Sequence, residues 1–174
     1  MVKQLIVERS KTVVLVLDYQ NRMLGKLAES SQTEILKKAN AILSEARRIG
    51  IPIIYEVRGG ERIPEREIHL AIAPKAGELV LTTQRTGPFT TTNLDEVLKK
   101  QNVDTLVLMG IPTSGCVLTT VRFAADMDYK LIVVSDCCAV PQDDELHRVL
   151  IEKVFPHQAT VVTSQEILGA LEKI

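Results

Sequence analysis

The stretch Thr105-Leu-Val-Leu-Met-Gly110-Ile-Pro-Thr-Ser-Gly-Cys116 runs from an apolar strand pattern through a tight turn to a cysteine. Val117, Val121 and Ala124 then recur at helical spacing, which predicts a helix that begins close to Cys116, capped by Thr113 or Ser114. Unpaired backbone N–H groups and the helix dipole at such a position favour a thiolate over a thiol. The pattern therefore predicts a reactive cysteine with a lowered pKa. The alternative is a small buried apolar residue, as free cysteines often are.

The composition indicates one globular domain. The chain has 174 residues, of which 45% are hydrophobic, so we assign residues 1–174 to a single domain. A formal net charge of −1 and an aromatic content of 3% argue against nucleic-acid and membrane partners. Three cysteines cannot all pair, and neither a secretory h-region nor an apolar run of membrane-spanning length is present, so we expect a cytoplasmic protein.

Short, wholly apolar runs alternate with amphipathic segments along the chain. Such runs are typical of parallel strands that are covered on both faces. The sequence therefore predicts an α/β fold: a single three-layer domain with a doubly wound, mainly parallel sheet of about six strands. The strand candidates are 12–17, 51–57, 78–81, 105–109, 131–135 and 160–163.

Helix boundaries are indicated by capping residues. Ser31-Gln-Thr-Glu34 has the pattern of a capping box for a helix that ends at Gly50. Further helices are expected to begin near 92–95, near 143–144 and at 164. Residues 58–75 are irregular, and we leave two interpretations open: a lid or substrate loop, and an ordinary surface excursion.

Asp18 is the first candidate partner for Cys116. It follows the apolar run that ends at Leu17, whereas Cys116 follows the fourth strand. In the common strand order 3-2-1-4-5-6 these two strands are neighbours at the point where strand order reverses, and ligands bind there beyond the carboxyl ends of the strands. An acid beside a thiol can serve as its general base. The alternative for Asp18 is a loop cap at a strand end, and we interpret Asp136, after the fifth strand, as structural.

No familiar cofactor or metal motif is present. The chain lacks a dinucleotide fingerprint, a phosphate-binding loop and an H-E-x-x-H pair. His69, His147 and His157 have no partner at metal-ligand spacing. We therefore expect no cofactor and no metal site.

Three segments together resemble the isochorismatase-like cysteine hydrolases, the superfamily of nicotinamidases, N-carbamoylsarcosine amidases and isochorismatases. Val14-Leu-Val-Leu-Asp18-Tyr-Gln-Asn21 is similar to the first strand with its catalytic Asp. Leu106–Val117 resembles the strand and turn that carry the nucleophilic cysteine. Leu81-Thr-Thr-Gln-Arg-Thr-Gly-Pro-Phe89 resembles the strand end that carries a catalytic Lys. The resemblance covers nearly the whole chain.

The resemblance implies a mechanism. In the family, an Asp takes the thiol proton, a Lys supports the charged pair, and the thiolate attacks an amide-type carbonyl to give a thioester that water cleaves. Asp18 and Cys116 match the first and last of these residues. A cis peptide bond four residues before the cysteine is a family feature, which implies a cis Ile111–Pro112 bond here. Family members often form dimers or tetramers, so a homo-oligomer is also implied.

Two positions depart from the family pattern. Thr83 stands where the catalytic Lys is expected, and Arg85, two residues on and therefore on the same side of an extended strand, is the candidate cation. Pro112 stands where a backbone N–H helps to form the oxyanion hole, and proline has no N–H. The zinc ligands of nicotinamidases have no counterpart after the second strand, where the sequence reads Tyr55-Glu-Val-Arg-Gly-Gly60.

These observations lead to two main hypotheses. The first is a hydrolase of a small amide or other C–N substrate, with Cys116, Asp18 and Arg85 as the catalytic residues. Its substrate-binding surface is assigned to Thr83, Pro112, Thr113 and Phe89. The second is a catalytically impaired relative that binds a small molecule or serves as a subunit. A third, a redox-sensing thiol protein, requires Cys137 or Cys138 to approach Cys116.

Overall fold

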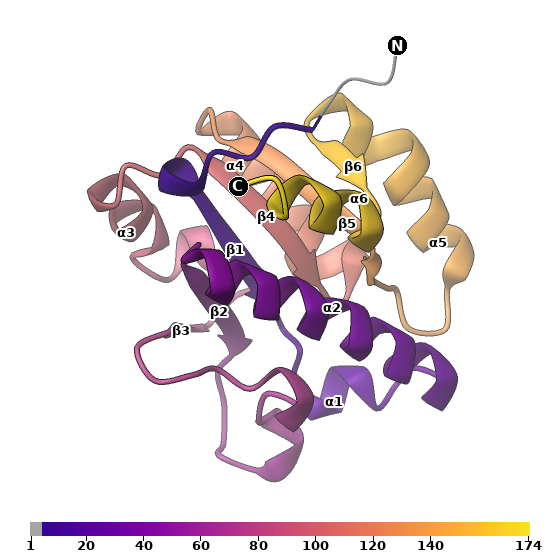
Figure 1. Ribbon diagram of the computed structural model, residues 1–174. Helices are drawn as coiled ribbons and strands as arrows, with labels where there is room; N and C mark the ends of the chain where they lie inside the picture. Colours follow the sequence, from indigo (N-terminus) through magenta and orange to yellow (C-terminus); the bar gives the residue numbers. More distant parts are fainter. Residues whose placement is uncertain (1–4) are drawn as a thin grey trace.

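The computed structural model describes residues 5–174, and its centre is one six-stranded sheet with every strand parallel (Figure 1). The strand order is β3-β2-β1-β4-β5-β6. The expected α/β class, the parallel sheet and the reversal of strand order between β1 and β4 are therefore confirmed. The strands are β1 (Thr12–Leu17), β2 (Ile53–Arg58), β3 (Leu79–Thr83), β4 (Thr105–Gly110), β5 (Lys130–Cys138) and β6 (Thr160–Val162).

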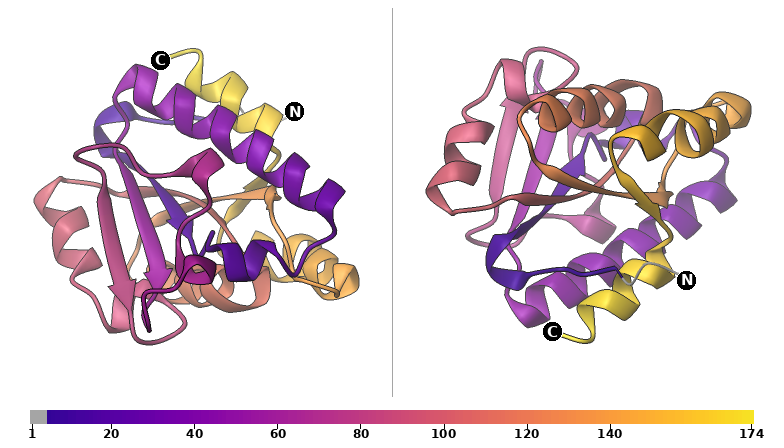
Figure 2. Two further views of the ribbon diagram at one scale, coloured as in Figure 1. Left: turned by 90° about the horizontal axis from the view of Figure 1, so that it is seen from below. Right: turned by 90° about the horizontal axis from the view of Figure 1, so that it is seen from above.

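Helices cover both faces of the sheet, as the apolar strands require. Figure 2 shows the long indigo-purple helix and the yellow C-terminal helix on one face, and the remaining larger helices on the other. Side chains of β1 alternate between the two layers, with Val14 and Val16 in one core cluster and Val13, Leu15 and Leu17 in the other. The helices are α1 (Asn21–Leu24), α2 (Glu29–Ile49), α3 (Leu94–Lys100), α4 (Leu118–Asp126), α5 (Asp144–Val149) and α6 (Ser164–Leu171).

Several predicted helix boundaries are confirmed, but neither Thr113 nor Ser114 caps the helix near Cys116: α4 begins at Leu118, and no side chain caps it or the turn Thr113–Val117 before it. α2 stops at Gly50, whose φ of +78° is a left-handed conformation that glycine adopts without steric cost. Asp143 caps α5 by accepting a hydrogen bond from the Leu146 N–H, and α6 begins at Ser164. The predicted capping box at residues 31–34 is wrong. α2 begins at Glu29, so these residues lie inside the helix rather than at its start.

The register of the central strands brings the candidate residues to one edge. Leu17 pairs with Gly110 on β4 and with Glu56 on β2. The Asp18 N–H then donates to the Glu56 carbonyl oxygen at 2.9 Å. Asp18 itself has φ +51°, a conformation that aspartate tolerates better than most residues. The chain therefore turns sharply at Asp18 on leaving the sheet.

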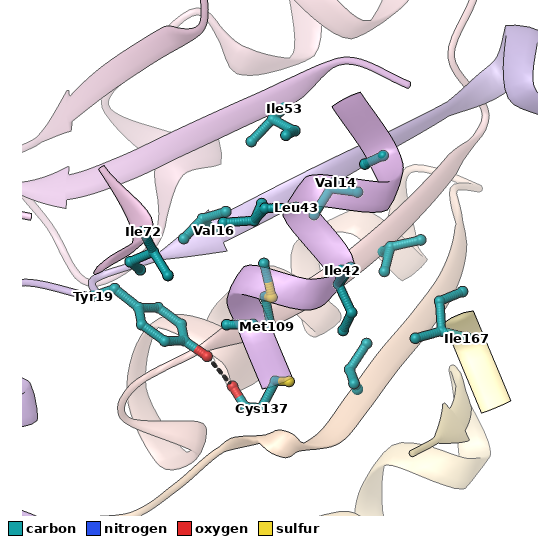
Figure 3. Packing of buried hydrophobic residues seen from close by; sticks show 14 of the residues in the cluster. Val14, Val16, Tyr19, Ile42, Leu43, Ile53, Ile72, Met109, Cys137 and Ile167 are labelled. Carbon is teal, nitrogen blue, oxygen red and sulfur yellow. Dashed lines mark hydrogen bonds between the residues drawn. The ribbon is translucent and has the colours of Figure 1, made fainter. Parts of the chain in front are cut away.

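A hydrogen bond made by the next residue, Tyr19, holds Asp18 in place. Tyr19 is fully buried, and its hydroxyl donates a hydrogen bond to the Cys137 carbonyl oxygen at the end of β5 (Figure 3). Figure 3 shows its ring among apolar side chains such as Ile72 and Met109. The residue adjacent to Asp18 is thus anchored across the core.

Among the described residues, no helix combines the length and the apolar run needed to cross a membrane.

Residues 58–75 pack against the segment that follows Asp18. Gln20 forms an isolated bridge with Ile68, and the Asn21 side-chain amide donates to the Pro64 carbonyl oxygen at 2.9 Å. Short 3₁₀ turns at Pro64–Arg66 and Leu70–Ile72 lie within this stretch. Because it is tied to residues 20–21, this segment lies beside the carboxyl end of β1.

Candidate active site

A cavity of about 570 Å³ opens at the C-terminal edge of β1, β2 and β4. Its wall combines strand ends, α1 and the segment after β2. Both Asp18 and Cys116 line it, as the strand order predicts. The lining residues are Asp18, Arg22, Met23, Glu56, Arg58, Gly59, Arg66, Gln84, Thr86, Pro112 and Cys116.

Asp18 is a buried carboxyl group with one free oxygen. Only 7% of the residue is exposed, and Oδ2 accepts a hydrogen bond from the Arg22 guanidinium at 2.9 Å. Oδ1 is buried and has no hydrogen-bond partner among the described residues. Burial raises the pKa of Asp18 to about 6, against the lowering effect of Arg22 and Arg58. Asp18 is therefore largely ionised at pH 7 and has an oxygen available to accept a proton.

Glu56 is a second buried carboxyl group in the cavity, and sequence reasoning did not select it. The residue is 3% exposed, and Oε1 accepts a hydrogen bond from the Thr83 hydroxyl at 2.6 Å. Oε2 has no partner in the described part of the chain. Burial raises the pKa of Glu56 to about 7; the Thr83 hydrogen bond opposes this and the charge of Asp18 adds to it. A glutamate inside the apolar run of β2 was the sequence signal, because burying an unpaired charge is costly.

Cys116 lies in a π-helical turn, Thr113–Val117, that leads into α4. Its Sγ is 3.5 Å from the Pro112 carbonyl oxygen and 3.8 Å from the Leu17 carbonyl oxygen, which places it against the end of β1. The expected lowering of its pKa is wrong. Burial, followed by the charges of Glu56 and Asp18, holds the pKa of the thiol well above its usual range, and the Val117 N–H opposes this. The helix-terminal N–H effect is present, but desolvation exceeds it.

The turn before Cys116 has the geometry that the sequence predicts. The Ile111–Pro112 bond is cis, which confirms that expectation. Gly115 sits close to the proline ring, where an added Cβ would lie 2.9 Å from the Pro112 Cγ. A larger residue at 115 would press on the turn that carries the cysteine.

Comparison with known proteins agrees with this architecture. The family profile described as "Isochorismatase domain" matches residues 12–166. The chain belongs to the isochorismatase family. This is a family of hydrolases, and the resemblance inferred from the three sequence segments is confirmed.

Individual relatives cover much of the chain. The secreted isochorismatase effector Isc1 of Verticillium dahliae is 29% identical over 170 residues, which is 90% of each protein. Maleamate amidohydrolase of Pseudomonas putida is 35% identical over 104 residues, 60% of this chain and 48% of that protein. The structure of N-carbamoylsarcosine amidase from Thermoplasma acidophilum has a TM-score of 0.78 and 28% identity, covering 88% of this chain and 96% of that one.

Arg85 does not occupy the place expected for the cation of an isochorismatase-family triad. Its side chain is exposed and is absent from the residues that line the cavity. β3 ends at Thr83, so the alternation of an extended strand no longer determines where Arg85 points. The cation that contacts Asp18 is instead Arg22, four residues later on α1.

The other predicted binding residues divide into two groups. Pro112 lines the cavity. Thr83 does not line it, but its hydroxyl donates a hydrogen bond to Glu56, which does. Phe89 and Thr113 lie elsewhere and do not line it. The Phe89 ring packs against Tyr129 with 6.0 Å between centroids, and the buried Thr113 hydroxyl is 2.8 Å from Nδ1 of His147.

Positive charge in the cavity comes from three arginines that sequence reasoning missed. Arg22, Arg58 and Arg66 line it, and Arg66 Nη1 is held by the Gly59 carbonyl oxygen at 2.7 Å. The 58–75 segment therefore forms part of the cavity wall, which favours the substrate-loop interpretation. Across residues 5–174, no group of three or more His, Cys, Asp or Glu side chains has an arrangement that could hold a metal ion.

Proposed function

We propose that the protein hydrolyses a small amide or other C–N substrate through a Cys116 thioester. Asp18 is the general base, and Arg22 takes the supporting role that the family assigns to a Lys. One observation carries this proposal: the Cys116 thiol and an ionised Asp18 oxygen, which has no hydrogen-bond partner within residues 5–174, line the same cavity.

The charge states support base-assisted attack. The thiol is neutral at pH 7 because its pKa is raised, so it needs a base as it attacks. Asp18, with a pKa of about 6, is ionised under the same conditions and can take the proton. The Sγ–C bond forms, the C–N bond breaks as the nitrogen takes a proton and leaves as ammonia or an amine, and water then cleaves the C–S bond to release an acid and return a proton to the thiolate.

The arginines suggest the kind of substrate. Guanidinium groups bind carboxylates well, often through two parallel hydrogen bonds. Arg58 is the last residue of β2 and Arg66 lies in the segment after it, and both line the cavity, so they can hold a charged group while the amide approaches Cys116. We therefore propose an amide that also carries a carboxylate. The partial match to maleamate amidohydrolase makes maleamate a suitable first test compound.

A second candidate function is small-molecule binding without turnover. Two specific observations favour it. Pro112 provides no N–H for an oxyanion, and loss of one such donor costs about 3 kcal/mol of transition-state stabilisation. Thr83 provides no ammonium group near the thiol. The two candidates differ in whether a covalent acyl intermediate forms.

The test is ammonia release from maleamate, compared with its uncharged diamide, by the parent protein and by Cys116→Ser. Turnover by the parent, loss in the variant and an acyl adduct on Cys116 in the mass spectrum of the quenched reaction are expected. Saturable binding of maleamate without ammonia release or adduct would contradict hydrolysis and favour the binding protein. Equal rates for both amides would contradict the carboxylate preference.

A further inference from the structure

Two carboxyl groups in the cavity each keep one buried oxygen without a partner. Asp18 Oδ1 and Glu56 Oε2 are these atoms, and no other buried side-chain oxygen or nitrogen in the described part of the chain lacks a partner. Leaving such atoms unpaired costs stability, so they mark a place where a ligand or a reacting group completes the hydrogen bonding. The base role proposed for Asp18 accounts for one of them. Glu56 has no role yet.

We propose that Glu56 is a second catalytic acid–base residue, which gives its proton to the leaving nitrogen and later takes one from the attacking water. This inference rests on the thioester mechanism proposed for Cys116. It gives a role to the carboxyl group that accepts a hydrogen bond from Thr83, the residue that stands where the family pattern has a Lys.

The position of Glu56 fits this role. Glu56 pairs with Leu81 across β2 and β3, so Thr83, two residues further, lies on the same side of the sheet. The Thr83 hydroxyl fixes Oε1 at 2.6 Å and leaves Oε2 free. The short threonine that replaces the expected Lys thus leaves room for a carboxyl group and orients it.

The surroundings raise the pKa of Glu56 to near neutral pH. Burial is the main cause, and the negative charge of Asp18, at the end of β1, adds to it. Arg22 on α1 and Arg58 on β2 act in the opposite sense, although burial outweighs them. Because burial raises the pKa of Glu56 to about 7 and that of Asp18 to about 6, the pair holds one proton between these pH values, and the Thr83 hydrogen bond leaves Glu56 Oε2 placed to carry it.

The proton steps balance over one cycle. Asp18 takes the thiol proton as the Sγ–C bond forms and the carbonyl electron pair moves to oxygen. The C–N bond then breaks while the Glu56 O–H bond passes its proton to nitrogen, leaving a Glu56 carboxylate. Water attacks the thioester and gives a proton to Glu56, the C–S bond breaks, and the thiolate recovers its proton from Asp18. The sum is amide plus water to acid plus amine.

The experiment compares two substrates with different leaving groups in the parent, Glu56→Gln and the control Glu96→Gln. Glu96 is an exposed glutamate on α3 and does not line the cavity. Maleamate needs a protonated leaving nitrogen, whereas p-nitrophenyl acetate releases a stable phenolate. Glu56→Gln is expected to slow maleamate hydrolysis by about 100-fold, within the range of general acid catalysis. Acylation of Cys116 by p-nitrophenyl acetate is expected to be unchanged or faster, because a negative charge near the thiol is removed.

Three outcomes separate the proposals. Equal loss on both substrates would overturn the role of Glu56 as a leaving-group acid while keeping Cys116 as nucleophile. No acylation of Cys116 by p-nitrophenyl acetate in the parent would overturn the thioester mechanism itself. If Glu56→Gln does not fold, the parent alone decides: kcat/KM for maleamate should fall as pH rises through about 7, and the acylation rate should not. A maleamate rate that stays level from pH 6.5 to 9 would overturn the proposal.

Discussion

Two places on the same edge of the sheet carry buried or half-buried carboxyl groups, and they differ in how completely those groups are bonded. At the end of β5, Asp136 Oδ1 accepts from the Ser164 N–H at 2.6 Å, and Oδ2 accepts from the Ser164 hydroxyl and lies 3.3 Å from Lys38 Nζ. At the ends of β1 and β2, Asp18 and Glu56 each keep one oxygen that has no hydrogen-bond partner in the part of the chain that the structure describes. A carboxylate whose two oxygens both have hydrogen-bond partners stabilises the fold. A carboxylate with an unpartnered oxygen is available to bind a ligand or to transfer a proton.

Exchange of aspartate for asparagine at the two places should show the largest contrast. Asp18→Asn removes the base, so maleamate hydrolysis is expected to fall by about 100- to 10,000-fold while the fold persists. Asp136→Asn is expected to change the rate little but to lower the free energy of unfolding by about 1–3 kcal/mol, because the bonds to Ser164 and Lys38 are weakened. Steady-state kinetics and urea unfolding of both variants measure this. Similar rate losses in the two would break the comparison.

Glu56→Gln should stabilise the protein at alkaline pH. The pKa of Glu56 is raised from 4.5 to about 7 on folding, so its contribution to stability is present in acid and is lost as pH rises through 7. A neutral amide avoids this loss, and the expected gain at pH 8 is about 3 kcal/mol relative to the parent, from the size of the shift. At pH 4 the two proteins should be nearly equal. Urea midpoints at both pH values measure the difference, and a variant that is less stable at pH 8 would contradict burial of an unpaired charge.

Arg22→Gln and Arg85→Gln distinguish the two candidate cations by a smaller effect. Arg22 lowers the pKa of Asp18, so its removal should raise that pKa and shift the acid limb of the pH–rate profile upward. The expected loss is roughly tenfold at pH 6 and less at pH 8. Arg85 is exposed, and its replacement should change the rate less than twofold. An acid limb that moves with Arg85 rather than with Arg22 would return the supporting role to the residue chosen from sequence.

Local patterns were sufficient for the elements and for two of the reacting groups. Apolar runs and helix stops predicted the parallel sheet, and the strand order then placed Asp18 and Cys116 on one edge. The cis bond before Pro112 followed from the family resemblance. These features depend on residues close together in the chain or on a topology that many sequences share, so they can be read without coordinates.

The chemical state of the site was decided by the tertiary structure alone. The raised pKa of Cys116, the contact of Arg22 with Asp18 and the free oxygen of Glu56 each result from burial and from distances between side chains on separate elements. No local pattern encodes these quantities, because desolvation depends on everything packed around a group. The sequence by itself determined where the site lies. Packing determined that Arg22 is the cation beside Asp18, that Glu56 is a second carboxyl group in the site, and that the Cys116 thiol is protonated.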